Sequence, residues 1–160
     1  MPDAELSKNQ SLLLKVIAEL GEVDTNTRLM EIFLVGEEYG LLESDYEFTF
    51  PRWGAFLPNS SNLYDDLENL CEKNLVEKCC YKASQDASRH VENIVLDEKF
   101  QFLLDVLKDP RVEFHTLCEM LYALHKEEID IEGLRKYSGK YFMVLEGELP
   151  PYLEIINHFA

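Results

Sequence analysis

The segment 111–126 is the feature that most limits how this 160-residue chain can fold. Drawn as a helix, it carries apolar side chains round most of its circumference and leaves only a narrow polar stripe. A helix of that kind must be covered on nearly every side, so we place it at the centre of a core. Its polar stripe consists of His115, Glu119, Tyr122 and Lys126, which recur at helical spacing.

Apolar residues recur at helical spacing in several other segments as well. Further helices are predicted over the ranges 6–20, 25–40, 59–74, 100–107 and 152–159. Thr, Asn and Ser residues stand where the second and third of these begin, and such residues cap helices. From residue 129 onwards glycine and proline divide the tail into short pieces, of which only the last is assigned.

Strand signals are fewer. Tyr46, Phe48 and Phe50 alternate with polar residues, which predicts a half-buried strand over 45–50. The runs 75–81 and 90–96 are rich in Val, Ile, Cys and Tyr, and the polar segment between them suggests a β-hairpin.

The order of these elements predicts an α+β, mainly helical fold. Residues 1–96 would form a winged-helix-like part with a small β-hairpin, and residues 97–160 a helical C-terminal extension packed on it as one compact unit.

Two stretches resemble the YwgA-like family of small prokaryotic proteins. The first is RLMEIFL at 28–34, and the second runs from the YEF at 46–48 through Leu75 and includes NLYDDLENL at 62–70. Between them, WGAFL at 53–57 keeps the aromatic, glycine, aromatic order of a Tyr-Gly-Pro-Tyr-Ser loop in that family, without its Pro and Ser. The resemblance implies a winged-helix fold akin to domains found in regulators and antitoxin-like proteins, and it implies no reaction.

The charge of the chain bears on nucleic-acid binding. Lys and Arg number 15 against 31 Asp and Glu, a net charge of −16. In a winged helix the third helix enters the DNA groove, but the predicted helix 59–74 is acidic and would repel phosphate. We therefore expect no nucleic-acid partner. A sequence-specific DNA-binding transcriptional regulator is the alternative function that we keep.

We expect a cytoplasmic protein without a membrane segment. No apolar run approaches the ~20 residues needed to span a bilayer, and the N-terminus lacks a signal-peptide pattern. Four cysteines in such a chain fit reduced thiols better than disulfides.

The sequence predicts neither a metal site nor a cofactor. Cys79 and Cys80 are adjacent on a predicted strand and would point to opposite faces. His115 has Glu119 one turn away, which is the arrangement of a general base and the carboxylate that orients it. Such a polar stripe is more often the solvent-exposed side of a helix. Without a phosphate loop or a nucleophile elbow, we predict no enzymatic activity.

Two aromatic stretches are the candidate interaction surface. Arg52, Trp53 and Phe56 lie in a short loop between two prolines, and Trp with Arg is a frequent anchor pair of interfaces. The competing interpretation is that Trp53 folds inward. Tyr137 and Tyr141 lie in the one locally basic, aromatic-rich stretch. These residues predict an adaptor that acts through contacts with a protein partner, and the family resemblance implies that it is regulatory or antitoxin-like.

The C-terminal part carries more large apolar residues than its short segments can hide. This excess, which extends from position 137 to position 159, predicts a symmetric homodimer formed by the C-terminal half. The alternative is that the tail packs back over the N-terminal part and completes a monomeric core.

Overall fold

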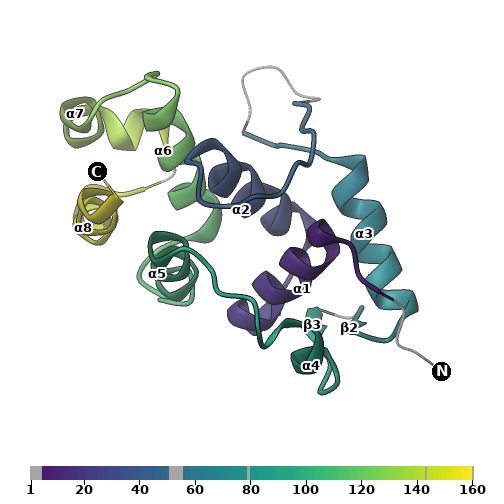
Figure 1. Ribbon diagram of the computed structural model, residues 1–160. Coiled ribbons are helices and arrows are strands. Elements are labelled where there is room, and N and C mark those ends of the chain that lie inside the picture. The colour runs from purple at the N-terminus through teal and green to yellow at the C-terminus, as the bar shows by residue number, and fades with distance from the viewer. Residues whose placement is uncertain (1–4, 51–55, 79, 143, 160) are drawn as a thin grey trace.

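Helices predominate in the computed structural model, which describes residues 5–50, 56–78, 80–142 and 144–159. In the first half of the chain the elements are α1 (Lys8–Leu20), β1 (Glu22–Val23), α2 (Asn26–Glu38), α3 (Ser61–Glu72), β2 (Val76–Glu77) and β3 (Tyr81–Ala83). They are followed by α4 (Ala87–Val91), α5 (Glu98–Val106), α6 (Phe114–His125), α7 (Ile131–Tyr141), the 3-10 turn η1 (Glu146–Glu148) and α8 (Leu149–Phe159). The predicted mainly helical α+β class is confirmed (Figure 1).

Local sequence explains where the first helices begin. Ser7 caps α1 through a capping box, in which the Ser7 side chain accepts from the backbone of Gln10 and the Gln10 side chain accepts from Ser7. Ser60 caps α3 by accepting a hydrogen bond from the Leu63 amide at 3.2 Å. These caps lie in or next to the predicted starts.

The three strands form one small antiparallel sheet in the order β1-β3-β2. The hairpin is shorter than predicted, because β2 pairs directly with β3 and the second predicted strand, 90–96, is not a strand. Ala87 and Val91, one helical turn apart, are both buried, so this region starts with the short helix α4. Cys80 has φ 60° and lies in the turn between β2 and β3 rather than on a strand, and Cys79 lies outside the described residues.

The predicted strand over 45–50 is also wrong. Within this described segment, the backbone forms one isolated β-bridge, between Thr49 and Asn59, and no strand. Tyr46 is buried for another reason: its ring meets the Phe33 ring edge-on at 5.5 Å, and its hydroxyl donates to Asp66 Oδ2 at 2.7 Å. The aromatic alternation therefore marks a loop held against α2 and α3.

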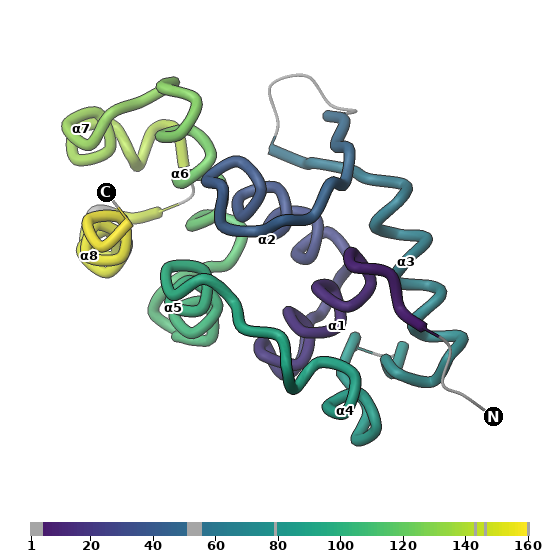
Figure 2. Tube along the Cα trace, in the orientation of Figure 1, coloured from purple at the N-terminus to yellow at the C-terminus, as the bar shows by residue number. Residues whose placement is uncertain are grey.

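One hydrophobic core joins both halves of the chain. In Figures 1 and 2 the later helices lie along one side of α1 and α2, with α6 against α2 and α5 against α1. The prediction that the 111–126 helix is central is confirmed, although α6 begins at Phe114 with Glu113 as its cap. Its buried residues are Phe114, Thr116, Leu117, Cys118, Met120, Leu121 and Ala123.

Packing against α2 is tight at Gly36. A Cβ atom added there would stand 2.6 Å from a Leu42 methyl carbon and 2.7 Å from a Phe100 ring carbon. Phe100 is fully buried and Leu42 nearly so, so neither side chain has free space beside it.

The C-terminal tail covers the core. Most of the residues that seemed in excess are buried: Phe142, Val144, Leu149, Tyr152, Ile155, Ile156 and Phe159. The premise that short segments could not hide them is therefore wrong, since α8 packs across the fold and its Tyr152 hydroxyl accepts a hydrogen bond from the Glu113 amide at 2.7 Å. From that set Tyr137, Tyr141 and Leu145 remain clearly exposed.

None of the helices in the described ranges has the length and apolar character of a transmembrane span.

Candidate functional site

The loop candidates do not form an exposed anchor in the part that is described. Arg52 and Trp53 lie outside the described residues. Phe56 is buried, with its ring 5.3 Å from the Tyr122 ring and 5.8 Å from the His115 ring. It therefore packs against the polar stripe of α6 and is not accessible as an anchor, contrary to the sequence prediction.

The polar stripe itself is engaged with α2. His115 Nδ1 lies 2.6 Å from Glu31 Oε2, although the two residues are 84 positions apart. The Glu31 side chain is only 2% exposed, whereas that of His115 is 39% exposed. The carboxylate that orients the imidazole thus comes from α2, and Glu119 is not that partner.

Burial and hydrogen bonding set the proton affinity of this pair. Desolvation of the buried carboxyl raises the pKa of Glu31, and the hydrogen bond from His115 opposes that rise. The hydrogen bond to Glu31 raises the pKa of His115. Both directions favour a proton held between the imidazole and the buried carboxyl.

A second set of polar contacts fixes the other end of the stripe. Glu38, at the end of α2, accepts from Lys126 Nζ at 3.1 Å and lies 3.3 Å from His125 Nε2. Close by, the Tyr39 hydroxyl donates to the Leu121 carbonyl at 2.6 Å. We call this line of contacts, from Glu31 and His115 to Glu38 and Lys126, the α2–α6 seam.

Two side chains of α6 beside the seam could in principle act as nucleophiles, and both are engaged or buried. The Thr116 hydroxyl donates to Glu113, and the pKa of the fully buried Cys118 thiol is raised by desolvation, so neither is a ready nucleophile. No three His, Cys, Asp or Glu side chains within the described ranges are placed to hold a metal ion. The seam joins α2 to α6 through these polar contacts.

The predicted tyrosines lie elsewhere, on α7. Tyr137 is 52% exposed and Tyr141 is 61% exposed. Their rings meet edge-on with centroids 6.4 Å apart, and Lys140 Nζ lies 5.8 Å from the Tyr141 ring centroid. The structure thus brings Tyr137 and Tyr141 together on α7, and places Phe56 elsewhere, against α6.

Few side chains hold α7 to the fold. Asp130 caps it by accepting from the Gly133 amide at 2.7 Å, and of its residues only Leu134 and Ser138 are buried. Exposed polar and aromatic side chains occupy most of the remaining circumference. We call them the α7 outer face: Glu132, Arg135, Lys136, Tyr137, Lys140 and Tyr141.

Sequence reasoning found the exposed tyrosines but missed both the helix that carries them and the partner of His115. Asp130 followed by Gly133, Leu134 and Ser138 was the available signal for a capped helix. For Glu31 no local signal exists, because its role arises from a contact between distant segments.

Comparison of the chain with family models, with curated proteins and with solved structures gave no match.

Proposed function

We propose that the protein is a non-enzymatic adaptor that acts through protein–protein contacts, with the α7 outer face as its contact surface. The packing of α7 carries this proposal. Of its 11 residues only two are buried, while two tyrosine rings stand in solvent. Because α7 contributes so little to the core, core packing does not account for its exposed tyrosines, whereas contact with a partner does.

The side chains of this face suit recognition. Tyrosine supplies a large, rigid contact area at a low entropic cost and is enriched at protein interfaces. Arg135 adds a guanidinium, the other group that interfaces favour. Lys136 and Lys140 lie beside the tyrosines, so a carboxylate-bearing partner surface fits this half of the face best.

Regulatory or antitoxin-like action in the cytoplasm is the context we propose. The order α1, β1, α2, α3, β2, β3 with sheet order β1-β3-β2 supports a winged-helix-like assignment, and the resemblance at 28–34 and 46–75 points the same way. Such folds occur in DNA-binding regulators too. Here the exposed side of α3 carries Asp65 and Glu72, which oppose phosphate, so the DNA-binding alternative has the weaker support.

The test is affinity capture from source cells with three forms of the tagged chain. We expect Tyr137→Ala/Tyr141→Ala to lose the proteins that wild type retains. Tyr64→Ala, which removes an exposed tyrosine from α3, is the matched control and should retain them. Identical capture by all three forms would remove the α7 outer face as the contact surface.

A fluorescence-anisotropy titration with mixed-sequence duplex DNA at about 0.15 M salt tests the alternative. Sub-micromolar binding would favour the DNA-binding regulator, and we expect none.

A further inference from the structure

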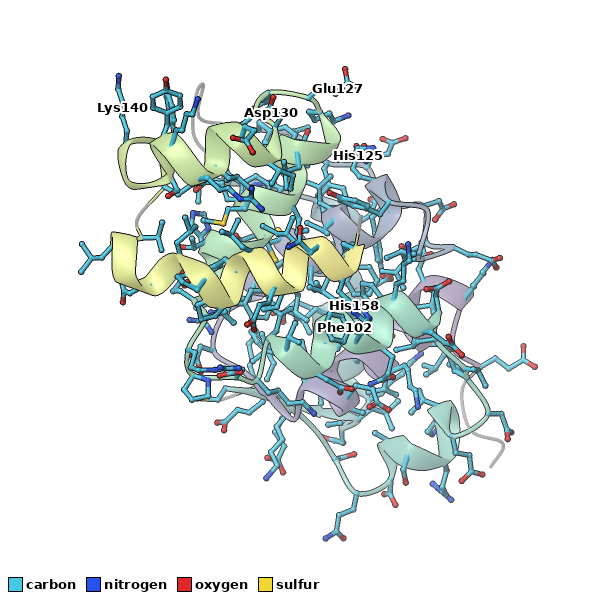
Figure 3. The ribbon with its side chains drawn as sticks, turned by 90° about the vertical axis from the view of Figure 1, so that its left-hand side faces the viewer. Phe102, His125, Glu127, Asp130, Lys140 and His158 are labelled. Atoms are coloured by element: carbon cyan, nitrogen blue, oxygen red, sulfur yellow. The ribbon has the colours of Figure 1, made fainter. Side chains whose placement is uncertain are left out.

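The charges around α7 are divided by sign along its length. Four exposed acidic side chains lie at its N-terminal end: Glu127, Glu128, Asp130 and Glu132. Three exposed basic side chains lie from its middle onwards: Arg135, Lys136 and Lys140. Figure 3 shows this separation, with Lys140 projecting at one end of the helix and Asp130 and Glu127 lying towards the other.

We infer that the α7 outer face binds the same face of a second copy of this chain, with the two α7 helices antiparallel about a two-fold axis. This inference rests on the proposed function, since it names the partner of that surface. It also proposes the homodimer that the sequence predicted, but on a different basis. The apolar residues that motivated the prediction are mostly buried, and the argument now rests on charge complementarity.

The division of charge is the first argument for a second copy. A surface selected to bind a uniformly acidic partner would be basic throughout, whereas the α7 outer face begins with Glu132, next to Glu127, Glu128 and Asp130, and is basic from Arg135 to Lys140. A surface of that kind is complementary to itself when reversed, which is what a two-fold axis requires. The two helix dipoles are also opposed in an antiparallel pair, with each acidic helix start near the other's basic end.

Helix geometry gives the register. At 100° per residue, Glu132 and Lys136 both lie on the side of α7 away from the buried Leu134. If the two-fold axis crosses the pair at the level of position 134, Glu132 of each copy stands opposite Lys136 of the other. The contact is then made twice. A parallel arrangement would instead set Lys136 against Lys136.

The side chains concerned are available for such a contact. Lys136 and Lys140 form no ion pair with another described residue, and the bond from Arg135 to Glu132, at 3.3 Å, joins two exposed groups. A two-fold axis perpendicular to a helix brings the same flank of both copies together, so Tyr137 lies on one side of the contact in both. Exposed ion pairs are weak and each copy carries −16, so we expect a weak dimer whose population depends on protein concentration.

Sedimentation equilibrium of the full chain from about 5 to 500 µM tests the inference. The average mass of wild type should rise with concentration from 18.6 kDa towards twice that value. Lys136→Glu and Glu132→Lys should each stay monomeric, because each sets like charges against one another in both contacts. Lys82→Glu, an equal change of charge at an exposed position on β3, should associate nearly as wild type does.

Mixing supplies the decisive arm. One variant carries Glu at both positions 132 and 136 and the other carries Lys at both, so an equimolar mixture restores both contacts and should associate. Circular dichroism of each variant verifies that it is folded.

Three results would overturn the inference: a wild-type chain that is monomeric throughout, association that survives in both single variants, or single variants that do not associate when mixed. None of these decides the adaptor function, which depends on capture through Tyr137 and Tyr141. Conversely, unchanged capture by the tyrosine variant removes the function whatever the mass is.

Discussion

His115→Ala should destabilise the protein chiefly by leaving the Glu31 carboxylate buried without its partner. The pair joins α2 to α6 at 2.6 Å, and the Glu31 side chain is 2% exposed. Breaking a fully buried ion pair costs about 3–5 kcal/mol, and a hydrogen bond to a charged group about 1.5–3 kcal/mol. The His115 ring is 39% exposed, so water reaches the carboxylate once the ring is gone, and we expect about 2 kcal/mol.

For a chain of this length, 1 kcal/mol corresponds to about 2–4 °C, so the melting temperature at pH 7 should fall by about 4–8 °C. Urea denaturation followed by circular dichroism measures the free energy of unfolding directly.

The control is the same substitution in a Glu31→Leu background. Leucine removes the buried charge with a side chain of similar size, so there is no carboxylate to strand and His115→Ala should then cost under ~1 kcal/mol. Equal costs in the two backgrounds would refute the reasoning, because they would show that the two side chains are not coupled.

Three further predictions follow from packing, titration and charge. Gly36→Ala should lower stability, because the added Cβ would overlap Leu42 and Phe100 and overpacking costs about 1–3 kcal/mol. This cost outweighs the advantage of alanine as a helix former, about 1 kcal/mol. A raised melting temperature would contradict the prediction. Burial raises the pKa of Glu37 to about 7, so its stabilising contribution is present at low pH and is lost as pH rises through 7. Wild type should therefore lose more stability between pH 5 and pH 7 than Glu37→Gln, whose amide oxygen still accepts from Ser44, and parallel pH profiles would exclude this role. Finally, melting temperature should rise between 0.1 M and 1 M NaCl, because salt screens the repulsion within a chain of net charge −16, and a flat or falling midpoint would show that local ion pairs dominate.

The helices with a strong apolar period were predictable from the sequence, and the polar seam was not. α6 is buried at seven of its 12 positions, so its pattern needs no knowledge of its neighbours. Glu31, by contrast, is a single acidic residue inside an apolar run, and only its contact with a histidine 84 positions away explains it. Local spacing carries no information about such a pairing.

The errors at 45–50 and 90–96 have a common cause. An alternating or β-branched run predicts a strand only if a neighbouring strand is there to pair with it, and that is a tertiary property. Tyr46 found a buried site against Phe33 and Asp66, and Val91 found one through α4.

α7 was missed because propensity and periodicity were both weak. Gly133 and Gly139 lower its helix propensity, and two buried positions give little apolar pattern. Because α7 buries only two residues, its outer face stays exposed to solvent.

The shared core has a consequence for how the chain is made on the ribosome. α2 acquires its main neighbour, α6, only when a segment about 90 residues further on has been synthesised. At 5–20 residues per second, that interval is roughly 5–20 s, during which the side of α2 that packs on α6 has no cover. We expect nascent chains halted near residue 96 to stay unfolded and to engage a holding chaperone, with cooperative folding only after α6 emerges.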